Sequence, residues 1–323
     1  MIETATVADL FTRWDIPWFI TAALALTALI YVRGWMRIRR TRPELFRSWR
    51  LACFLSGILA IFVAVSSPLD TFSESLLFMH MAQHWVLISI APPLIVFGAP
   101  VVPMLRGLPR WLIRRPLGPL FRTGALPYLG RFLTRRRVAW LAMNIAYIGW
   151  HIPSAYEFAL SSENWHNCEH ACFFLTSLMF WWPVIRPWPS RPASQRWLII
   201  LYLALANVVN TGLSAMLCFS GRLFYPSYAA VPRLFGLSAL NDQIAAGAFM
   251  WVCGTMAYMI PAILIVVQLL STPVYRPINH PRHRSKAGAE FESPSPKNAP
   301  PVEADSPADP PTRQSAMAVL PLV

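Results

Sequence analysis

Apolar runs of about 20 residues recur along most of this chain, and they restrict its fold more than any other feature. A helix of that length crosses the hydrocarbon core of a bilayer, and lipid admits only helices or closed barrels. The runs predict an all-α polytopic integral membrane protein, a seven-transmembrane-helix bundle, with helices over residues 17–36, 49–67, 76–98, 137–158, 165–185, 197–219 and 242–270. Only 13% of the residues are charged, about half the share in soluble domains.

The basic residues lie almost entirely in alternate loops. Of the 28 Lys and Arg residues, 25 fall in the first, third and fifth loops and in the C-terminal tail. The positive-inside rule assigns those segments to the cytoplasm, so we expect the N-terminus outside and the C-terminus in the cytoplasm. This distribution accounts for the net charge of +13 without a nucleic-acid-binding surface. The expected partner is the lipid bilayer, and no nucleic acid is expected.

The two ends of the chain differ in composition. No basic segment precedes the first apolar run, so we expect a retained helix rather than a cleaved signal peptide. The residues from Pro277 onward are rich in Pro, Ala, Ser and charge, which predicts a disordered cytoplasmic tail over 277–323, following a transmembrane domain over 1–276. The five cysteines all lie inside predicted spans. We interpret them as small buried packing residues rather than as a disulfide framework.

Proline and arginine mark two local features. Pro92 and Pro93 are predicted to kink the third run in its inner half, because proline has no N–H to continue the helix. The arginine-rich third loop contains GLPRWLIRRPLGPLFR, which we interpret as a topology-setting segment that touches the membrane surface.

Five histidines fall at one predicted depth near the outer face. His80 and His84 open the third span, His151 lies in the outer part of the fourth, and His166 and His170 open the fifth. Residues four apart share one side of a helix, so each pair can direct two rings at one ion. Ionisable groups inside a membrane face the bundle interior. The sequence therefore predicts a polar pocket near the outer surface with imidazoles at its centre.

Several ligands suit such a pocket. The cluster could hold copper, zinc or iron, or supply axial ligands to haem. Imidazole together with thioether favours copper, and Met79 and Met81 flank His80. Glu169 and Asp242 could orient imidazole N–H groups. A haem-binding membrane redox protein and a metal-free scaffold, whose polar network only fixes helix packing, remain as alternatives. No nucleophile–base pair or carboxylate dyad lies in the pocket, so the chain is not predicted to be an enzyme.

The chain contains, in this order, the segments HMAQHWVLISIAPPLIVFGAP, GWHIPSAYEFAL, WHNCEHACFFLTSLMFWWPVI, LFYPSY and GLSALNDQIAAGAFMW. Over roughly residues 45–270 it resembles the CtaG-type family of cytochrome c oxidase assembly factors, named for caa3-type oxidases. The resemblance implies a multi-pass protein of the bacterial plasma membrane, needed to make active haem–copper oxidase. It implies cytochrome c oxidase subunits or other assembly factors as partners. The family's motif positions correspond to His80, His84, His151, His166, His170, Glu169 and Asp242, and Gln243 also fits. We therefore predict copper handling at the outer face.

Overall fold

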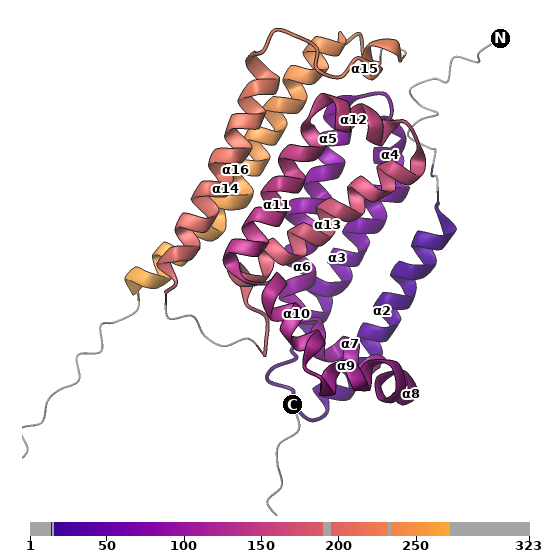
Figure 1. Ribbon diagram of the computed structural model, residues 1–323, viewed down its shortest axis with the longest axis vertical. Coiled ribbons are helices and arrows are strands. Elements are labelled where there is room, and N and C mark those ends of the chain that lie inside the picture. Colours follow the sequence, from indigo (N-terminus) through magenta and orange to yellow (C-terminus); the bar gives the residue numbers. More distant parts are fainter. Residues whose placement is uncertain (1–13, 15, 190–194, 232–233, 272–323) are drawn as a thin grey trace, which may run out of the picture. The chain divides into compact units, whose positions relative to one another are not determined.

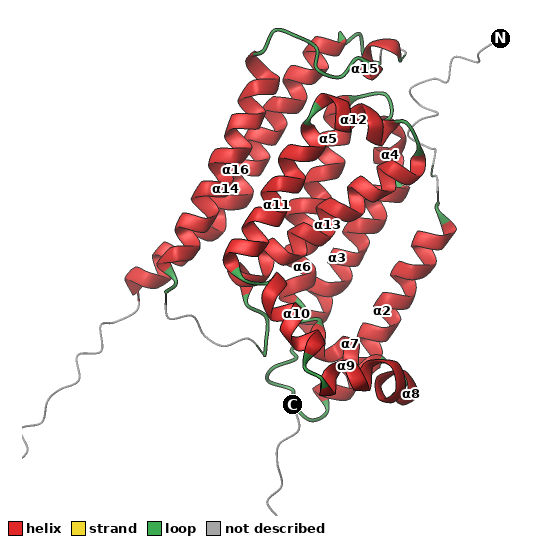
Figure 2. Ribbon diagram, in the orientation of Figure 1, coloured by secondary structure: helices red, strands yellow, loops and turns green. Residues whose placement is uncertain are grey.

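The computed structural model describes residues 14, 16–189, 195–231 and 234–271 (Figure 1). Within these residues the regular structure is helical and no strand occurs (Figure 2). The helices are α2 Trp18–Arg39, α3 Ser48–Ser66, α4 Pro68–Ser73, α5 Leu77–Trp85, η1 Val86–Ile90, α6 Ala91–Phe97, α7 Val101–Gly107, α8 Arg110–Leu112, η2 Ile113–Leu117, α9 Gly118–Arg122, α10 Ala125–Leu133, α11 Arg136–His151, α12 Pro153–Leu160, α13 Glu163–Ile185, α14 Trp197–Phe219, α15 Ser227–Ala230 and α16 Ala239–Ser271. The predicted tail over 277–323, with its boundary after residue 276, lies outside the described residues.

Six helices are long and apolar enough to cross a membrane. They are Trp18–Arg39, Ser48–Ser66, Leu77–Phe97, Glu163–Ile185, Trp197–Phe219 and Ala239–Ser271. Each coincides, within a few residues, with one of the predicted apolar runs. The prediction of an all-helical chain with multiple membrane-crossing helices is therefore confirmed for the part of the chain that the structure describes.

The run at 137–158 differs from the prediction of one continuous helix. The chain forms α11 and α12 there, and Ile152 between them is extended, with φ −64° and ψ 127°. Pro153 follows, and the ring of a proline disfavours the helical conformation at the residue before it. With 16 residues, α11 is about 24 Å long at 1.5 Å per residue. The expectation of a single helix over this run was wrong, because Pro153 ends α11 directly after His151.

The helix Leu77–Phe97, formed by α5, η1 and α6, is the most enclosed of the six. In its most apolar stretch of 18 residues, 61% is buried inside the protein, whereas the corresponding share is 17% to 39% in the other five helices. It packs against α3, α13 and α16. Pro92 and Pro93 follow a π-helical turn, and neither can donate an N–H to the carbonyl of Ile88. The indole of Trp181 on α13 donates to that carbonyl at 2.9 Å, so the predicted kink is a π-turn secured from a neighbouring helix.

Two glycines bring α7 into backbone contact with α2. A β-carbon at Gly34 would lie 1.8 Å from the carbonyl oxygen of Pro103, and one at Gly107 would lie 1.8 Å from that of Ile30. Only glycine permits such an approach. The start of the arginine-rich segment is therefore held against α2 by packing.

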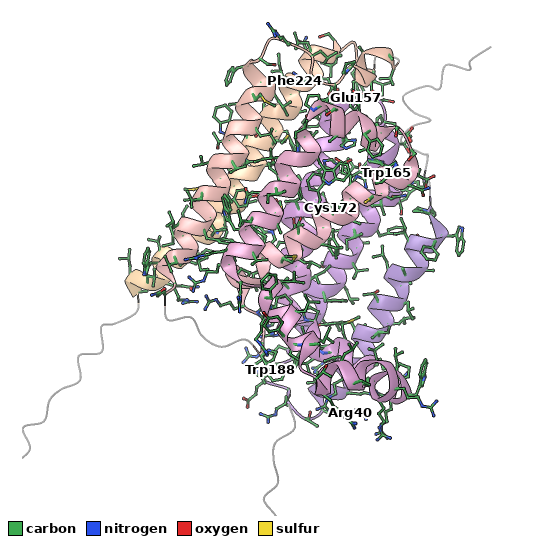
Figure 3. The ribbon with its side chains drawn as sticks, in the orientation of Figure 1. Arg40, Glu157, Trp165, Cys172, Trp188 and Phe224 are labelled. Carbon is green, nitrogen blue, oxygen red and sulfur yellow. The ribbon has the colours of Figure 1, made fainter. Side chains whose placement is uncertain are left out.

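One end of the bundle gathers the elements that matter for function. There α5, α13 and α16 begin, α11 and α14 end, and the short helices α4, α12 and α15 lie across them (Figure 1). Figure 3 shows Glu157 and Phe224 at this end and Arg40 and Trp188 at the other. The carboxylate of Glu157 on α12 accepts hydrogen bonds from the backbone and the hydroxyl of Ser227, so α12 and α15 are tied together. We call the end of the bundle where these elements gather the site end.

Candidate metal centre

Two of the histidines lie on the first turns of α5, and α16 fixes the start of that helix. His80 and His84 are one turn apart, with ring centroids 4.3 Å from each other and exposed fractions of 0% and 3%. The residue before α5, Leu76, has no side chain that could cap it. The carboxylate oxygens of Asp242 accept hydrogen bonds from the backbone N–H groups of Leu77 at 2.7 Å and Phe78 at 3.1 Å. A carboxylate at a helix N-terminus also suits the helix dipole.

The second pair of histidines lies on the first turns of α13, which has a cap of its own. The hydroxyl of Ser162 accepts a hydrogen bond from the backbone N–H of Trp165, and Glu163 supplies an acidic residue in the first turn. Both features favour a helix start at this point. His166 and His170 follow, with ring centroids 4.2 Å apart. The cap therefore fixes where this pair enters the bundle.

The two pairs meet. One ring nitrogen from each of His80, His84, His166 and His170 lies within 4.8 Å of the other three. We call these residues the four-histidine group. Four nitrogens bound tetrahedrally at 2.0–2.1 Å would be about 3.3–3.4 Å apart. The side chains would therefore have to close in around an ion, by about 1 Å or more for the most widely separated nitrogens.

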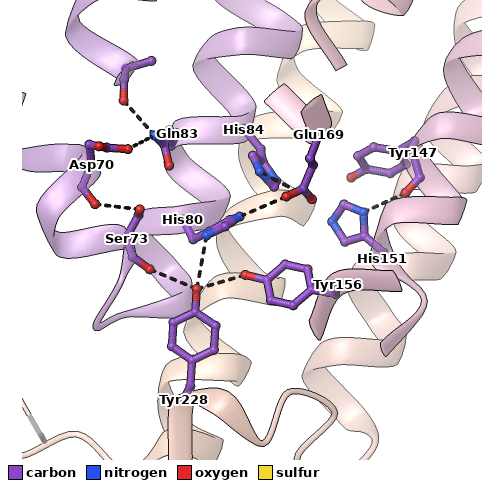
Figure 4. A network of polar contacts seen from close by, with 11 residues as sticks. Asp70, Ser73, His80, Gln83, His84, Tyr147, His151, Tyr156, Glu169 and Tyr228 are labelled. Atoms are coloured by element: carbon purple, nitrogen blue, oxygen red, sulfur yellow. Dashed lines mark hydrogen bonds and ion pairs between the residues drawn. The ribbon is translucent and has the colours of Figure 1, made fainter. Parts of the chain in front are cut away.

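Glu169, on α13, faces His80 and His84 of α5 (Figure 4). Its side chain is fully buried, and its oxygens are 4.0 Å from Nε2 of His80 and 3.8 Å from Nε2 of His84. Both distances are too long for hydrogen bonds. A carboxylate is also a ligand for transition metals. Glu169 therefore stands where it could complete an imidazole site, a more direct role than the orienting role predicted for it.

Eight buried polar atoms of this site have no hydrogen-bond partner among the described residues. They are Nε2 of His80, both ring nitrogens of His84, Nε2 of His151, His166 and His170, and both carboxylate oxygens of Glu169. Buried polar atoms in proteins are nearly always hydrogen-bonded, because an unpaired one costs about 1–3 kcal/mol. So many in one place mark a position suited to an ion or to ordered water.

A tyrosine pair sets the orientation of His80. The hydroxyl of Tyr228 donates to the carbonyl of Ser73 at 2.9 Å and lies 3.2 Å from Nδ1 of His80 and 2.9 Å from the hydroxyl of Tyr156 (Figure 4). Burial raises the pKa of Tyr228, so it keeps its proton. With the hydroxyl hydrogen of Tyr228 donated to the carbonyl of Ser73, the oxygen of Tyr228 accepts from Nδ1–H of His80. The lone pair of His80 is then on Nε2, the nitrogen that faces Glu169.

His151 stands apart from the four-histidine group. Its Nδ1 is 2.7 Å from the carbonyl of Tyr147, one turn earlier on α11, and its ring centroid is 6.4 Å from that of His84. The predicted five-histidine site is thus four histidines together and one beside them. His151 lines a small cavity with His84 and Met81.

The remaining predicted residues fall into different surroundings. Met81 is buried and lines the cavity just described, whereas Met79 packs with Phe72 and Leu76. Asp242 accepts hydrogen bonds from the backbone at the start of α5, the helix that carries His80 and His84. Gln243 joins α16 to the loop after α14, accepting from the backbone N–H of Phe224 at 2.8 Å. All five cysteines are free, and none of them is fully buried, so the prediction of buried packing residues was wrong for them.

Tyr228 and Tyr156 are not among the predicted site residues. Both lie in short helices that only the folded chain brings over the ends of α5 and α13. Their one sequence signal is that they belong to the segments LFYPSY and GWHIPSAYEFAL, which carry the family resemblance.

These features define a helical protein with several membrane-crossing helices and a buried histidine–carboxylate cluster at one end of its bundle. The chain belongs to the cytochrome c oxidase caa3 assembly factor (Caa3_CtaG) family, whose profile matches residues 29–272. The predicted family is thereby confirmed.

Curated relatives occur in mycobacteria. The chain is 26% identical over 282 residues to the uncharacterized protein ML1998 of Mycobacterium leprae (strain TN). It is 26% identical over 281 residues to the uncharacterized protein MT0111 of Mycobacterium tuberculosis (strain CDC 1551 / Oshkosh). Each match covers 83% of this chain but 40% of the relative, so the chain spans less than half the length of these proteins. No solved structure matches it significantly.

Proposed function

We propose that this protein supports cytochrome c oxidase assembly by binding copper at the four-histidine group and Glu169 and passing it on. The copper ion is cargo, not a resident cofactor, and no catalytic step is involved. The receiving partners would be cytochrome c oxidase subunits or other assembly factors. Membership of an assembly-factor family supports the pathway, and the geometry of the site supports the ion.

One observation carries the proposal: the converging imidazole nitrogens and the Glu169 oxygens are buried and lack hydrogen-bond partners among the described residues. A scaffold whose polar network only holds helices together would have these atoms bonded to one another, because a half-satisfied network destabilises the fold. Unpaired lone pairs aimed at one point are instead what a cation requires.

Copper suits the donor atoms better than the other ligands considered. Neutral imidazole is a good copper ligand, and the nearby thioether of Met81 favours the cuprous ion over harder metals.

Haem is disfavoured by the small volume of the cavity at the site. The cavity beside His84 encloses about 20 Å³, which holds one water-sized particle and not a porphyrin. A visible spectrum of the purified protein would reveal haem by a Soret band, and we expect none.

We infer that the site end faces outward and that α11 is the seventh crossing. The basic residues of the first and third loops belong to the opposite end, which the positive-inside rule assigns to the cytoplasm. Seven crossings then put the N-terminus outside and the C-terminus inside. In a bacterial plasma membrane the copper would be handled at the extracytoplasmic surface.

The test is a Cu(I) titration of the purified full-length protein against a chromophoric chelator. We expect the four-histidine group to bind Cu(I) tightly, and this site to weaken by more than about 100-fold in a variant with both His80→Ala and His170→Ala, because changes outside the ligand shell alone cost 10–100-fold. A variant with both His280→Ala and His283→Ala removes as many imidazoles from the tail and is the matched control, expected to bind like wild type. Equal affinity of all three proteins would contradict the proposal.

A further inference from the structure

A small cavity continues from the four-histidine group into the bundle. It is bounded by residues of α5, η1, α11, α14 and α16 and is lined by Met81, His84, Trp85, Ile88, Ser89, Tyr147, His151, Asn210, Met250, Gly254 and Tyr258. Its volume of about 20 Å³ is sufficient for one water-sized particle. The cavity therefore has room for a single ion or a single water molecule.

His84 borders both this cavity and the four-histidine group. Its Nε2 is 3.8 Å from Glu169, on the side of the group, and its Nδ1 is the other nitrogen of the same ring. Both nitrogens are buried and without a hydrogen-bond partner in the described part of the chain. A neutral imidazole has one N–H and one lone pair, and either nitrogen can take either role. This ring can therefore serve a ligand on either side.

His151 supplies the second imidazole of the cavity. It is 1% exposed, and its Nδ1 is engaged by the carbonyl of Tyr147 at 2.7 Å. The carbonyl can only accept, so Nδ1 carries the hydrogen and Nε2 keeps the lone pair. That Nε2 is buried and has no partner among the described residues. Its ring centroid lies 6.4 Å from that of His84.

Thioether sulfur is the second kind of donor at this cavity. Met81 and Met250 both line it and are 1% and 5% exposed. Two imidazoles with thioether form a soft donor set, which suits Cu(I) and not Mg²⁺ or Ca²⁺. Met79 belongs to the same helix but packs with Phe72 and Leu76. Of these two methionines of α5, Met81 therefore lines the cavity and Met79 does not.

From this geometry we propose a second copper position, a Cu(I) site formed by His84, His151 and the sulfur of Met81, one step deeper in the bundle than the four-histidine group. His84 borders both positions and, with one lone pair, ligates one ion at a time. When it binds the deeper ion, His80, His166 and His170 remain for the ion in the four-histidine group. An ion can then pass between them by exchanging ligands around one ring, without becoming uncoordinated in the membrane interior. This inference rests on the proposed function for its source of copper, but its ligands can be tested separately.

The experiment is anaerobic Cu(I) loading of the full-length protein, followed by copper counting and copper K-edge X-ray absorption. We expect two coppers per chain, with a sulfur scatterer. In Met81→Leu, a replacement that conserves volume and shape closely, we expect one copper and no sulfur scatterer. Met79→Leu is the matched control and should keep two coppers and the sulfur. The double variant His80→Ala and His170→Ala should keep one copper with sulfur.

The outcomes separate the two proposals. One copper per wild-type chain without a sulfur scatterer would overturn the second position, leave the four-histidine site intact and assign the cavity to a water molecule. A sulfur scatterer that persists in Met81→Leu would overturn the ligand assignment. A wild-type protein that retains no copper would overturn both the second position and the proposed function.

Discussion

Gln83 and His84 are neighbours on α5, yet their side-chain nitrogen atoms have different surroundings. The amide nitrogen of Gln83 donates to the carbonyl of Ala64 at 2.8 Å and to the carboxylate of Asp70 at 2.6 Å (Figure 4). Neither ring nitrogen of His84 has a hydrogen-bond partner in the described part of the chain. The first arrangement joins α5 to α3 and α4, and the second leaves donor atoms free for a ligand.

The same contrast separates two carboxylates. Asp242 accepts hydrogen bonds from two backbone N–H groups of α5, whereas the oxygens of Glu169 have no such partner among the described residues. Buried polar groups that are paired stabilise the fold, and unpaired ones destabilise it unless a ligand binds. The paired carboxylate of Asp242 therefore serves the architecture, and the unpaired carboxyl group of Glu169 is available to a ligand.

The largest expected effect is a loss of Cu(I) affinity. Replacing His80 and His170 by alanine together is expected to weaken Cu(I) binding at the four-histidine group by more than about 100-fold. It is also expected to lower the unfolding free energy, because two buried rings and the contact of His80 Nδ1 with Tyr228 are lost. Chelator competition and denaturant titration of the same preparation measure the two quantities. A double variant that folds and still binds Cu(I) with wild-type stoichiometry and affinity would contradict the account.

Asp242→Ala is expected to affect stability first. It leaves two buried N–H groups of α5 without an acceptor, which costs about 2–4 kcal/mol of unfolding free energy. Denaturant titration of the detergent-solubilised protein measures this. Asn241→Ala, at the exposed neighbouring position, is the control and should change little. Equal stability of the two variants would show that the cap is unimportant.

Glu169→Gln, in contrast to Asp242→Ala, is expected to affect copper binding rather than stability. The amide of glutamine has nearly the same shape as the carboxyl group it replaces, so the unfolding free energy of the copper-free protein is expected to change by less than about 1 kcal/mol. The substitution should weaken Cu(I) binding by about 10–100-fold. Glu163→Gln, an exposed change on the same helix, should alter neither quantity. Loss of stability in Glu169→Gln would contradict a ligand role and favour a packing role.

The smallest effect is expected from Trp181→Phe. The carbonyl of Ile88 would lose its only donor among the described contacts, at a cost of about 1–2 kcal/mol, while Cu(I) affinity stays unchanged. Trp165→Phe, at a 45% exposed position of the same helix, is the control. Thermal unfolding compares the two variants. A marked loss of Cu(I) affinity in Trp181→Phe would show that the π-turn also positions the imidazoles.

Much of the fold follows from the sequence, because length and hydropathy alone decide whether a helix can cross a bilayer. Six crossings could be predicted within a few residues in this way. The break at Ile152 has a local signal in Pro153, but hydropathy does not register it and the run reads as one helix. The close contact of α2 with α7 depends on Gly34 and Gly107 meeting, and no periodicity predicts which distant glycines meet.

The site could be predicted only in part. The i, i+4 spacing brings the members of each histidine pair together, and the shared depth predicts that the pairs meet, as they do in the four-histidine group. The separation of His151 depends on where α11 ends, and the cap by Asp242 depends on the register of α16 against α5. Tertiary packing sets both, so neither the distinct place of His151 nor the role of Asp242 could be derived from spacing.

The most direct test of the central claim is the copper K-edge absorption spectrum of the Cu(I)-loaded full-length protein. If the unpaired imidazoles are kept for copper, the spectrum will contain scattering from several histidine rings, and that signal will fall in the protein lacking His80 and His170. Protein that emerges from gel filtration without copper, or a ring signal that is the same in both proteins, would contradict the account.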